Sequence, residues 1–152
     1  MPIGGGGLLA GIAAAVKHLH PAAQVIGVEP ELEADAWRSF RTGVLSRLDR
    51  PSESIADAIK IQELGRLTWP LIHRHADDVV TVSEAQIAHA CRVTVDLANI
   101  VIEPGGAVGL AAALQDHRHL DRGGPVVAVA GGGNVDLAAL AKITEIGESA
   151  HG

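Results

Sequence analysis

Apolar and polar positions along the chain follow two patterns, short continuous apolar runs and longer stretches with apolar residues three to four apart. The short runs predict buried strands at 24–28, 78–82 and 125–130. The helical spacing predicts helices at 8–20, 34–41, 54–62, 68–75, 83–98 and 107–115 and from 137 onward. Ser83 and Gln86 have the spacing of a capping box at the start of the helix at 83–98. Because strands alternate with helices, we expect an α/β fold with a parallel sheet and helices on both faces.

The predicted sheet is thin for a complete domain. Three strands fall below the typical number of about 4–6, and a strand is expected to lead into the glycine run at 4–7, where only Met1 to Ile3 precede it. The 152 residues, 47% hydrophobic, suit one globular domain. We therefore expect residues 1–152 to form a single partial domain, truncated at its N-terminal side.

Charge and cysteine content narrow the function classes. The net charge of -6 disfavours binding to nucleic acid or to an anionic membrane surface. No apolar run approaches the roughly 20 residues that cross a bilayer. Cys91 is the single cysteine, so the chain cannot form an internal disulfide. It lies on the apolar stripe of the helix predicted at 83–98, so we expect it in the core. We expect a soluble, cytoplasmic protein.

Four consecutive glycines, Gly4, Gly5, Gly6 and Gly7, open the first predicted helix. Without side chains their backbone N–H groups can approach an anion, and the start of a helix adds unpaired donors. The run therefore indicates a phosphate-binding loop or, alternatively, a tight turn between a strand and a helix.

Two polar residues accompany the later glycine-rich turns. Glu103 follows an apolar stretch and precedes Pro-Gly-Gly, where it is a candidate site residue or an acid that favours a helix start. Asn134 follows three glycines at the end of the third predicted strand, where open α/β sheets bind ligands. It is also a candidate cap for the last helix.

Three acidic residues follow the first predicted strand closely: Glu29, Glu33 and Asp35. Clustered carboxylate oxygens suit Mg²⁺ or Ca²⁺. The alternative is an acidic face exposed to solvent.

Seven segments in this order resemble the serine racemase and threonine (serine) dehydratase family, the fold type II pyridoxal-phosphate enzymes with a tryptophan-synthase-beta-like fold. The resemblance covers residues 2 to about 140. The segments are Pro2–Ile12, Val25–Pro30, Ser54–Asp57, Leu67–Ile72, Val79–Glu84, Ile102–Gly109 and Gly132–Leu137.

The resemblance implies a role for each matching site residue. The run Gly4–Gly7 matches the loop that holds the phosphate of pyridoxal 5'-phosphate, and Glu103 matches a glutamate that approaches this cofactor. Gly131 and Asn134 match the loop beside the pyridine ring.

The same resemblance implies a divalent cation, Mg²⁺ or Ca²⁺. Glu29 and Asp35 match its side-chain ligands, and Glu33 stands where the family offers a backbone carbonyl.

The sequence departs from the family pattern at three points. Gly131 replaces a serine whose hydroxyl meets the pyridine nitrogen, and Ala58 replaces a glycine close to the cofactor. None of the three lysines, Lys17, Lys60 and Lys142, has the Ser-x-Lys context of the family's Schiff-base lysine. No catalytic lysine is therefore assigned.

The implied function is that of the C-terminal part of an L-threonine or L-serine dehydratase, an ammonia-lyase that yields a 2-oxo acid and ammonia. Serine racemisation is the alternative. The resemblance implies little activity for this chain alone, a missing N-terminal half or full-length homologue as partner, and a homo-oligomeric intact enzyme. A non-catalytic interaction module and a nucleotide-phosphate-binding half-domain remain alternatives.

Overall fold

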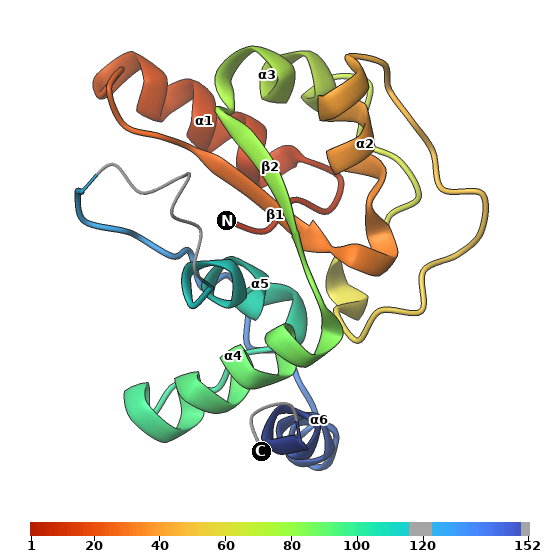
Figure 1. Cartoon of the computed structure of the whole chain (residues 1–152), viewed down its shortest axis with the longest axis vertical. Coiled ribbons are helices and arrows are strands. Elements are labelled where there is room, and N and C mark those ends of the chain that lie inside the picture. Colours follow the sequence, from red (N-terminus) through yellow and green to blue (C-terminus); the bar gives the residue numbers. More distant parts are fainter. Residues whose placement is uncertain (116–122, 150–152) are drawn as a thin grey trace.

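The computed structural model describes residues 1–115 and 123–149 (Figure 1). Within these ranges one sheet is surrounded by helices. The elements, in chain order, are α1 (Gly7–Leu19), β1 (Ile26–Pro30), the 3-10 turn η1 (Glu31–Glu33), α2 (Asp35–Thr42), the 3-10 turn η2 (Asp57–Ile59), α3 (Thr68–His75), β2 (Asp78–Val82), α4 (Glu84–Ala98), α5 (Pro104–Ala113) and α6 (Leu137–Ser149).

β1 and β2 pair in parallel, with Val28 opposite Val80, which confirms the predicted parallel sheet. The first residues of the chain pair with the other edge of β1. The N–H of Val28 donates to the carbonyl of Met1 at 2.8 Å, and the N–H of Ile3 donates to the carbonyl of Val28 at 3.2 Å. A short extended segment therefore leads into the glycine loop, as expected.

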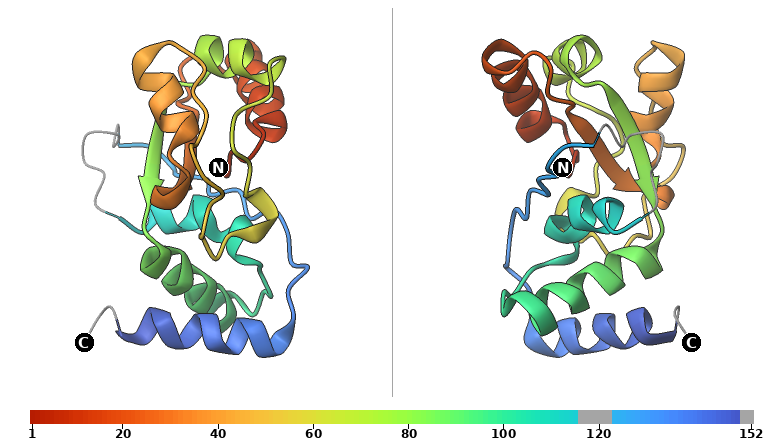
Figure 2. Two further views of the ribbon diagram at one scale, coloured as in Figure 1. Left: turned by 90° about the vertical axis from the view of Figure 1, so that its right-hand side faces the viewer. Right: turned by 60° about the vertical axis from the view of Figure 1, so that its left-hand side comes forward.

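Helices cover both faces of this sheet, as predicted (Figure 2). Successive side chains on a strand point to opposite faces. Val79 accordingly packs in one core cluster with residues of α1, α2 and α3. Its neighbour Val80 packs in a second cluster with residues of α4 and α5.

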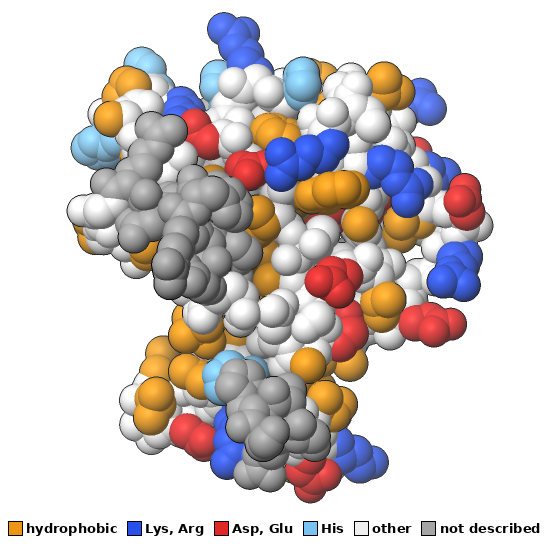
Figure 3. All heavy atoms as spheres, viewed as in Figure 1, with side chains coloured by type: hydrophobic (Ala, Val, Ile, Leu, Met, Phe, Trp, Pro, Cys, Tyr) orange, Lys and Arg blue, Asp and Glu red, His pale blue; other side chains and the backbone are white. Residues whose placement is uncertain are grey.

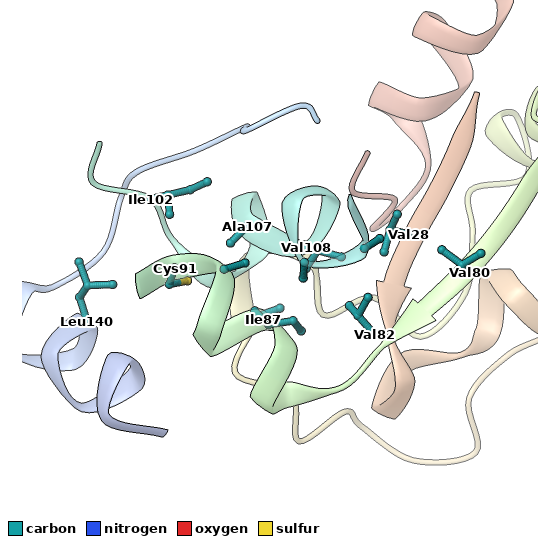
Figure 4. Close-up of a cluster of buried hydrophobic side chains, with 13 residues drawn as sticks. Val28, Val80, Val82, Ile87, Cys91, Ile102, Ala107, Val108 and Leu140 are labelled. Carbon is teal, nitrogen blue, oxygen red and sulfur yellow. The ribbon is translucent and has the colours of Figure 1, made fainter. Parts of the chain in front are cut away.

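The second cluster shows how α4 is fixed (Figure 4). Ile87 and Cys91 lie one turn apart and are fully buried, and Leu140 reaches the cluster from α6. Burial raises the pKa of the Cys91 thiol to about 12, so this thiol is a core group, as predicted. The predicted capping box is also confirmed: the amide of Gln86 donates to Ser83 Oγ, and the amide of Ser83 donates to Gln86 Oε1.

The strand predicted at 125–130 is wrong. The segment is irregular, with Val126 77% and Val127 84% exposed. A strand needs a neighbour to satisfy its backbone groups, and within the described residues neither edge of the sheet pairs with this segment.

The helix predicted at 54–62 is also wrong, because only the turn η2 forms. Serine side chains capture backbone donors there: Ser52 Oγ accepts from the amide of Ser54, and Ser54 Oγ accepts from the amide of Ala56. The amide of Ile55 donates to Glu84 on α4 at 2.6 Å. Such side-chain bonds compete with helical ones. Among all described helices, none is both long and apolar enough to span a membrane.

Candidate functional site

The glycine loop turns sharply between the first residues and α1. Gly4 and Gly6 have φ of 52° and 86°, a region that glycine enters without the steric cost of a side chain. The amide of Gly6 closes the turn by donating to the carbonyl of Ile3 at 3.0 Å. A Cβ on Gly6 would lie 2.6 Å from Ile72 Cδ1, so α3 closes the rear of the loop.

The front of the loop is open. A Cβ added to Gly5 or Gly7 would meet nothing within 4 Å. α1 has no side-chain cap and no acidic residue in its first turn. Within the described part of the chain, the amides of Gly5, Gly7 and Leu8 donate to no acceptor. Unpaired donors at a helix start attract anions, so this cradle fits a phosphate group.

The turn η2 and the start of α5 lie beside the loop. A Cβ on Gly4 would lie 3.3 Å from Ile59 Cβ, and one on Gly105 would lie 3.5 Å from Ile59 Cγ2. The same position on Gly105 is 3.3 Å from the Ala58 methyl. Ile59 therefore joins the glycine loop to α5, and Ala58 lies at this junction.

Glu103 meets the second glycine-rich loop, Gly131–Gly133. Its amide donates to the carbonyl of Gly132 at 3.1 Å. Gly132 has φ of 134°, and a Cβ added there would collide with the Glu103 carboxylate. Ile59 thus lies between the glycine loop at 4–7 and α5, while Gly131 and Gly132 lie against Gly106 of α5. Asn134 is exposed.

Asn134 does not cap the last helix, so that alternative is wrong. α6 begins at Leu137, and Asp136 Oδ1 accepts from the amides of Ala138 and Ala139 at 2.9 and 3.0 Å. Sequence reasoning missed Asp136, although an aspartate directly before an apolar helical run indicates an N-cap.

Glu29 is the most strongly perturbed of the three carboxylates after β1. It is 4% exposed, and its oxygens accept from the amides of Ala36 and Trp37 at the start of α2, at 3.2 and 2.5 Å. Burial raises its pKa to about 9 against the opposing effect of these hydrogen bonds, and the charge of Asp35 raises it further.

Glu33 and Asp35 are 3% and 4% exposed, so the alternative of an acidic face exposed to solvent is wrong. Burial raises the pKa of Glu33 to about 7 and that of Asp35 to about 6. Glu33 Oε1 is buried and has no partner among the described atoms.

The burial of these charges favours a cation, for which the resemblance implies two carboxylates and one backbone carbonyl as ligands. In residues 1–115 and 123–149 no group of three or more His, Cys, Asp or Glu side chains is placed to hold a metal ion. Both oxygens of Glu29 are already engaged by α2.

Comparison with known proteins agrees with this geometry. Residues 1–132 match the family described as "Pyridoxal-phosphate dependent enzyme". An L-threo-3-hydroxyaspartate ammonia-lyase of Pseudomonas sp is 40% identical over 93% of this chain and 44% of its own length. Serine racemase of Rattus norvegicus is 39% identical over 95% of this chain and 44% of its own length.

Solved structures show the same similarity. The T.th. threonine deaminase superposes with a TM-score of 0.82 at 41% identity, over 89% of this chain and 45% of that one. The chain thus spans less than half the length of the relatives it matches. With a family match over most of its residues and the fold of a solved relative, the chain belongs to the pyridoxal-phosphate dependent enzymes.

Proposed function

We propose that this chain forms the phosphate-holding side of the cofactor site in a pyridoxal-phosphate-dependent ammonia-lyase acting on L-threonine or L-serine. The observation that supports this most directly is the open glycine loop at 4–7, backed by α3 and leading into an uncapped α1. The similarity to ammonia-lyases and to serine racemase supports an amino-acid substrate.

When bound, pyridoxal phosphate supplies an electron sink that acidifies the α-hydrogen of an amino acid. The amides of Gly5, Gly7 and Leu8 would hold its phosphate, since they are unpaired within the described residues. Glu103 would lie at the ring, fixed through its amide to Gly132. Gly131 offers the pyridine nitrogen no side chain.

We further propose that a lysine-bearing part outside these residues completes the site. Lys17, the lysine nearest in sequence to the loop, has its ammonium 2.8 Å from Asp77 Oδ1 and 2.7 Å from the carbonyl of Ala23. Apolar side chains are exposed at Leu97, Val126 and Val127. Figure 3 shows hydrophobic side chains gathered at the end of α4. Exposed apolar surface of this kind favours a covering partner.

The test combines this chain with the part of the T.th. threonine deaminase that the chain does not match, by co-expression or fusion. We expect 2-oxo acid release from L-threonine or L-serine when pyridoxal phosphate is added, and none from either part alone. Conversion of L-serine to D-serine instead would support the racemase alternative. A correctly folded complex that binds no pyridoxal phosphate would contradict the proposal and favour a non-catalytic interaction module.

A matched pair of variants tests the loop within this complex. Gly7→Val places a side chain in the open cradle, whereas Gly11→Val places one on the exposed face of the same helix, where a Cβ also meets nothing within 4 Å. We expect Gly7→Val to lose cofactor binding and Gly11→Val to retain it. Equal cofactor affinity of the two variants would contradict the phosphate role.

A divalent cation at Glu29 and Asp35, with the Glu33 carbonyl, is a second proposal, supported by the burial of these charges. Mg²⁺ or Ca²⁺ at 100 times its dissociation constant would stabilise the fold by about 2.7 kcal/mol. We expect a higher melting temperature with either ion, an effect that Glu29→Gln abolishes and Glu31→Gln, at an exposed neighbour, retains. Equal melting temperatures with and without the ions would exclude the site.

A further inference from the structure

The carbonyl oxygen of Gly5 is held from behind the glycine loop. It accepts from Thr68 Oγ1 at 2.7 Å and from the amide of Gly65 at 3.2 Å. The Thr68 hydroxyl also lies 3.0 Å from the carbonyl of Gly65. A hydroxyl has one proton to donate, and the Gly65 carbonyl already accepts from the amides of Thr68 and Trp69. We therefore assign the hydroxyl proton to the shorter bond, the one to the Gly5 carbonyl.

These bonds fix the peptide between Gly5 and Gly6 at both ends. Its oxygen is bound by the turn before α3, and its N–H donates to the carbonyl of Ile3. Peptides between glycines rotate easily because no Cβ hinders them. Rotation of this peptide would break the bond to Thr68 and turn the Gly5 oxygen, which carries negative partial charge, away from its donors.

Thr68 also lies directly behind Gly6. It begins α3 and is half-buried. A Cβ on Gly6 would lie 2.8 Å from its hydroxyl and 3.1 Å from Leu64 Cδ2. The hydroxyl therefore fills the space behind Gly6, on the side of the loop opposite the open cradle.

We propose that Thr68 is a positioning residue for the phosphate site: its hydroxyl locks the Gly5 carbonyl to the rear so that the front of the loop presents only N–H groups. Thr68 itself does not touch the anion. The inference rests on the proposed function, because it assigns Thr68 to the same phosphate cradle.

The experiment measures binding of pyridoxine 5'-phosphate and of pyridoxine to the 152-residue chain by calorimetry. Neither probe carries an aldehyde, so neither can react with the lysines. Thr68→Val removes the hydroxyl at nearly constant shape, and Thr68→Ser keeps it. Thr42→Val is the matched control, because it removes a hydroxyl bonded to the carbonyl of Arg38 on α2.

We expect Thr68→Val to weaken binding of the phosphorylated probe about tenfold, the effect of one lost hydrogen bond on affinity. Binding of pyridoxine should not change, and Thr68→Ser and Thr42→Val should match the parent chain. Far-ultraviolet circular dichroism checks that each variant is folded. If Thr68→Val does not fold, Thr68→Ser decides, since a loss with the hydroxyl present would overturn the inference.

The outcomes separate this inference from the proposed function. A parent chain that prefers the phosphorylated probe, with Thr68→Val binding it equally well, would overturn the role of Thr68 alone. A folded parent chain that binds both probes equally would refute the phosphate cradle and the role of Thr68 with it.

Discussion

Two glycine-rich loops of this molecule each lead into a helix. They differ in whether a side chain accepts hydrogen bonds from the amides in the first turn of that helix. The loop at 4–7 precedes α1, which has no side-chain cap. The loop at 131–133 is followed by Asp136, whose carboxylate accepts from two amides at the start of α6. Similar composition therefore yields an uncapped helix start in one place and a capped helix start in the other.

The loops also differ in what lies against them. Gly6 packs on Ile72 of α3, while the front of its loop is empty. Gly132 packs on the side chain of Glu103. A glycine run alone thus does not indicate a phosphate site. Whether such a loop is open to an anion depends on two features: the cap of the following helix, and the side of the loop against which other residues pack.

The largest effect is expected at the rear of the first loop. Gly6→Ala forces a side chain into positive φ and into contact with Ile72, which should lower the free energy of unfolding by about 2–4 kcal/mol. Urea denaturation measures this change. Gly11→Ala on the same helix is the control and should raise stability by about 0.5–1 kcal/mol. Equal midpoints would contradict the conformation described for Gly6.

A smaller effect is expected where the second helix is capped. Asp136→Ala frees two amides at the start of α6 and should lower the free energy of unfolding by about 1 kcal/mol. The variant should also make this helix start resemble that of α1. Inorganic phosphate should then shift the amide resonances of Ala138 and Ala139, and it should leave them unchanged in the parent chain.

Asp96→Ala is the control for that variant. It removes an exposed ion pair with Arg92 that is worth about 0.3–0.5 kcal/mol. If Asp96→Ala lowers the free energy of unfolding as much as Asp136→Ala does, the cap stabilises the protein no more than this exposed ion pair.

The smallest effect on stability is expected at Gly131, where an added Cβ meets nothing within 4 Å. Gly131→Ser should change the free energy of unfolding by less than about 0.5 kcal/mol. In the completed enzyme its hydroxyl should strengthen pyridoxal-phosphate binding about fivefold, as one added hydrogen bond would. Gly131→Ala supplies the same Cβ without the hydroxyl and should leave the affinity unchanged. Equal affinities for the two variants would place the cofactor ring elsewhere.

Local patterns in the sequence were enough to predict most of the fold. Parallel strands followed from the apolar runs at 24–28 and 78–82, although β1 lies two residues later, at Ile26–Pro30. The capping box at Ser83 and Gln86 was visible from spacing alone. α3 was predicted with its exact limits, Thr68–His75.

The wrong predictions depend on distant partners. The run at 125–130 has the composition of a strand, but strand formation requires a paired neighbour, which composition does not reveal. The helix predicted at 54–62 is absent partly because the amide of Ile55 donates to Glu84, which lies 29 positions away in the sequence. The support of Gly5 by Thr68 spans 63 positions and leaves no local pattern.

Because Gly132 contacts Glu103, the substitutions that each of these two distant positions tolerates depend on the other. Any side chain at 132 would need the volume that the carboxylate occupies, so a change there alone displaces Glu103. A shorter residue at 103 would have to arise first, or with it. Among homologues we therefore expect these two positions to covary, with a larger residue at 132 accompanied by a smaller one at 103.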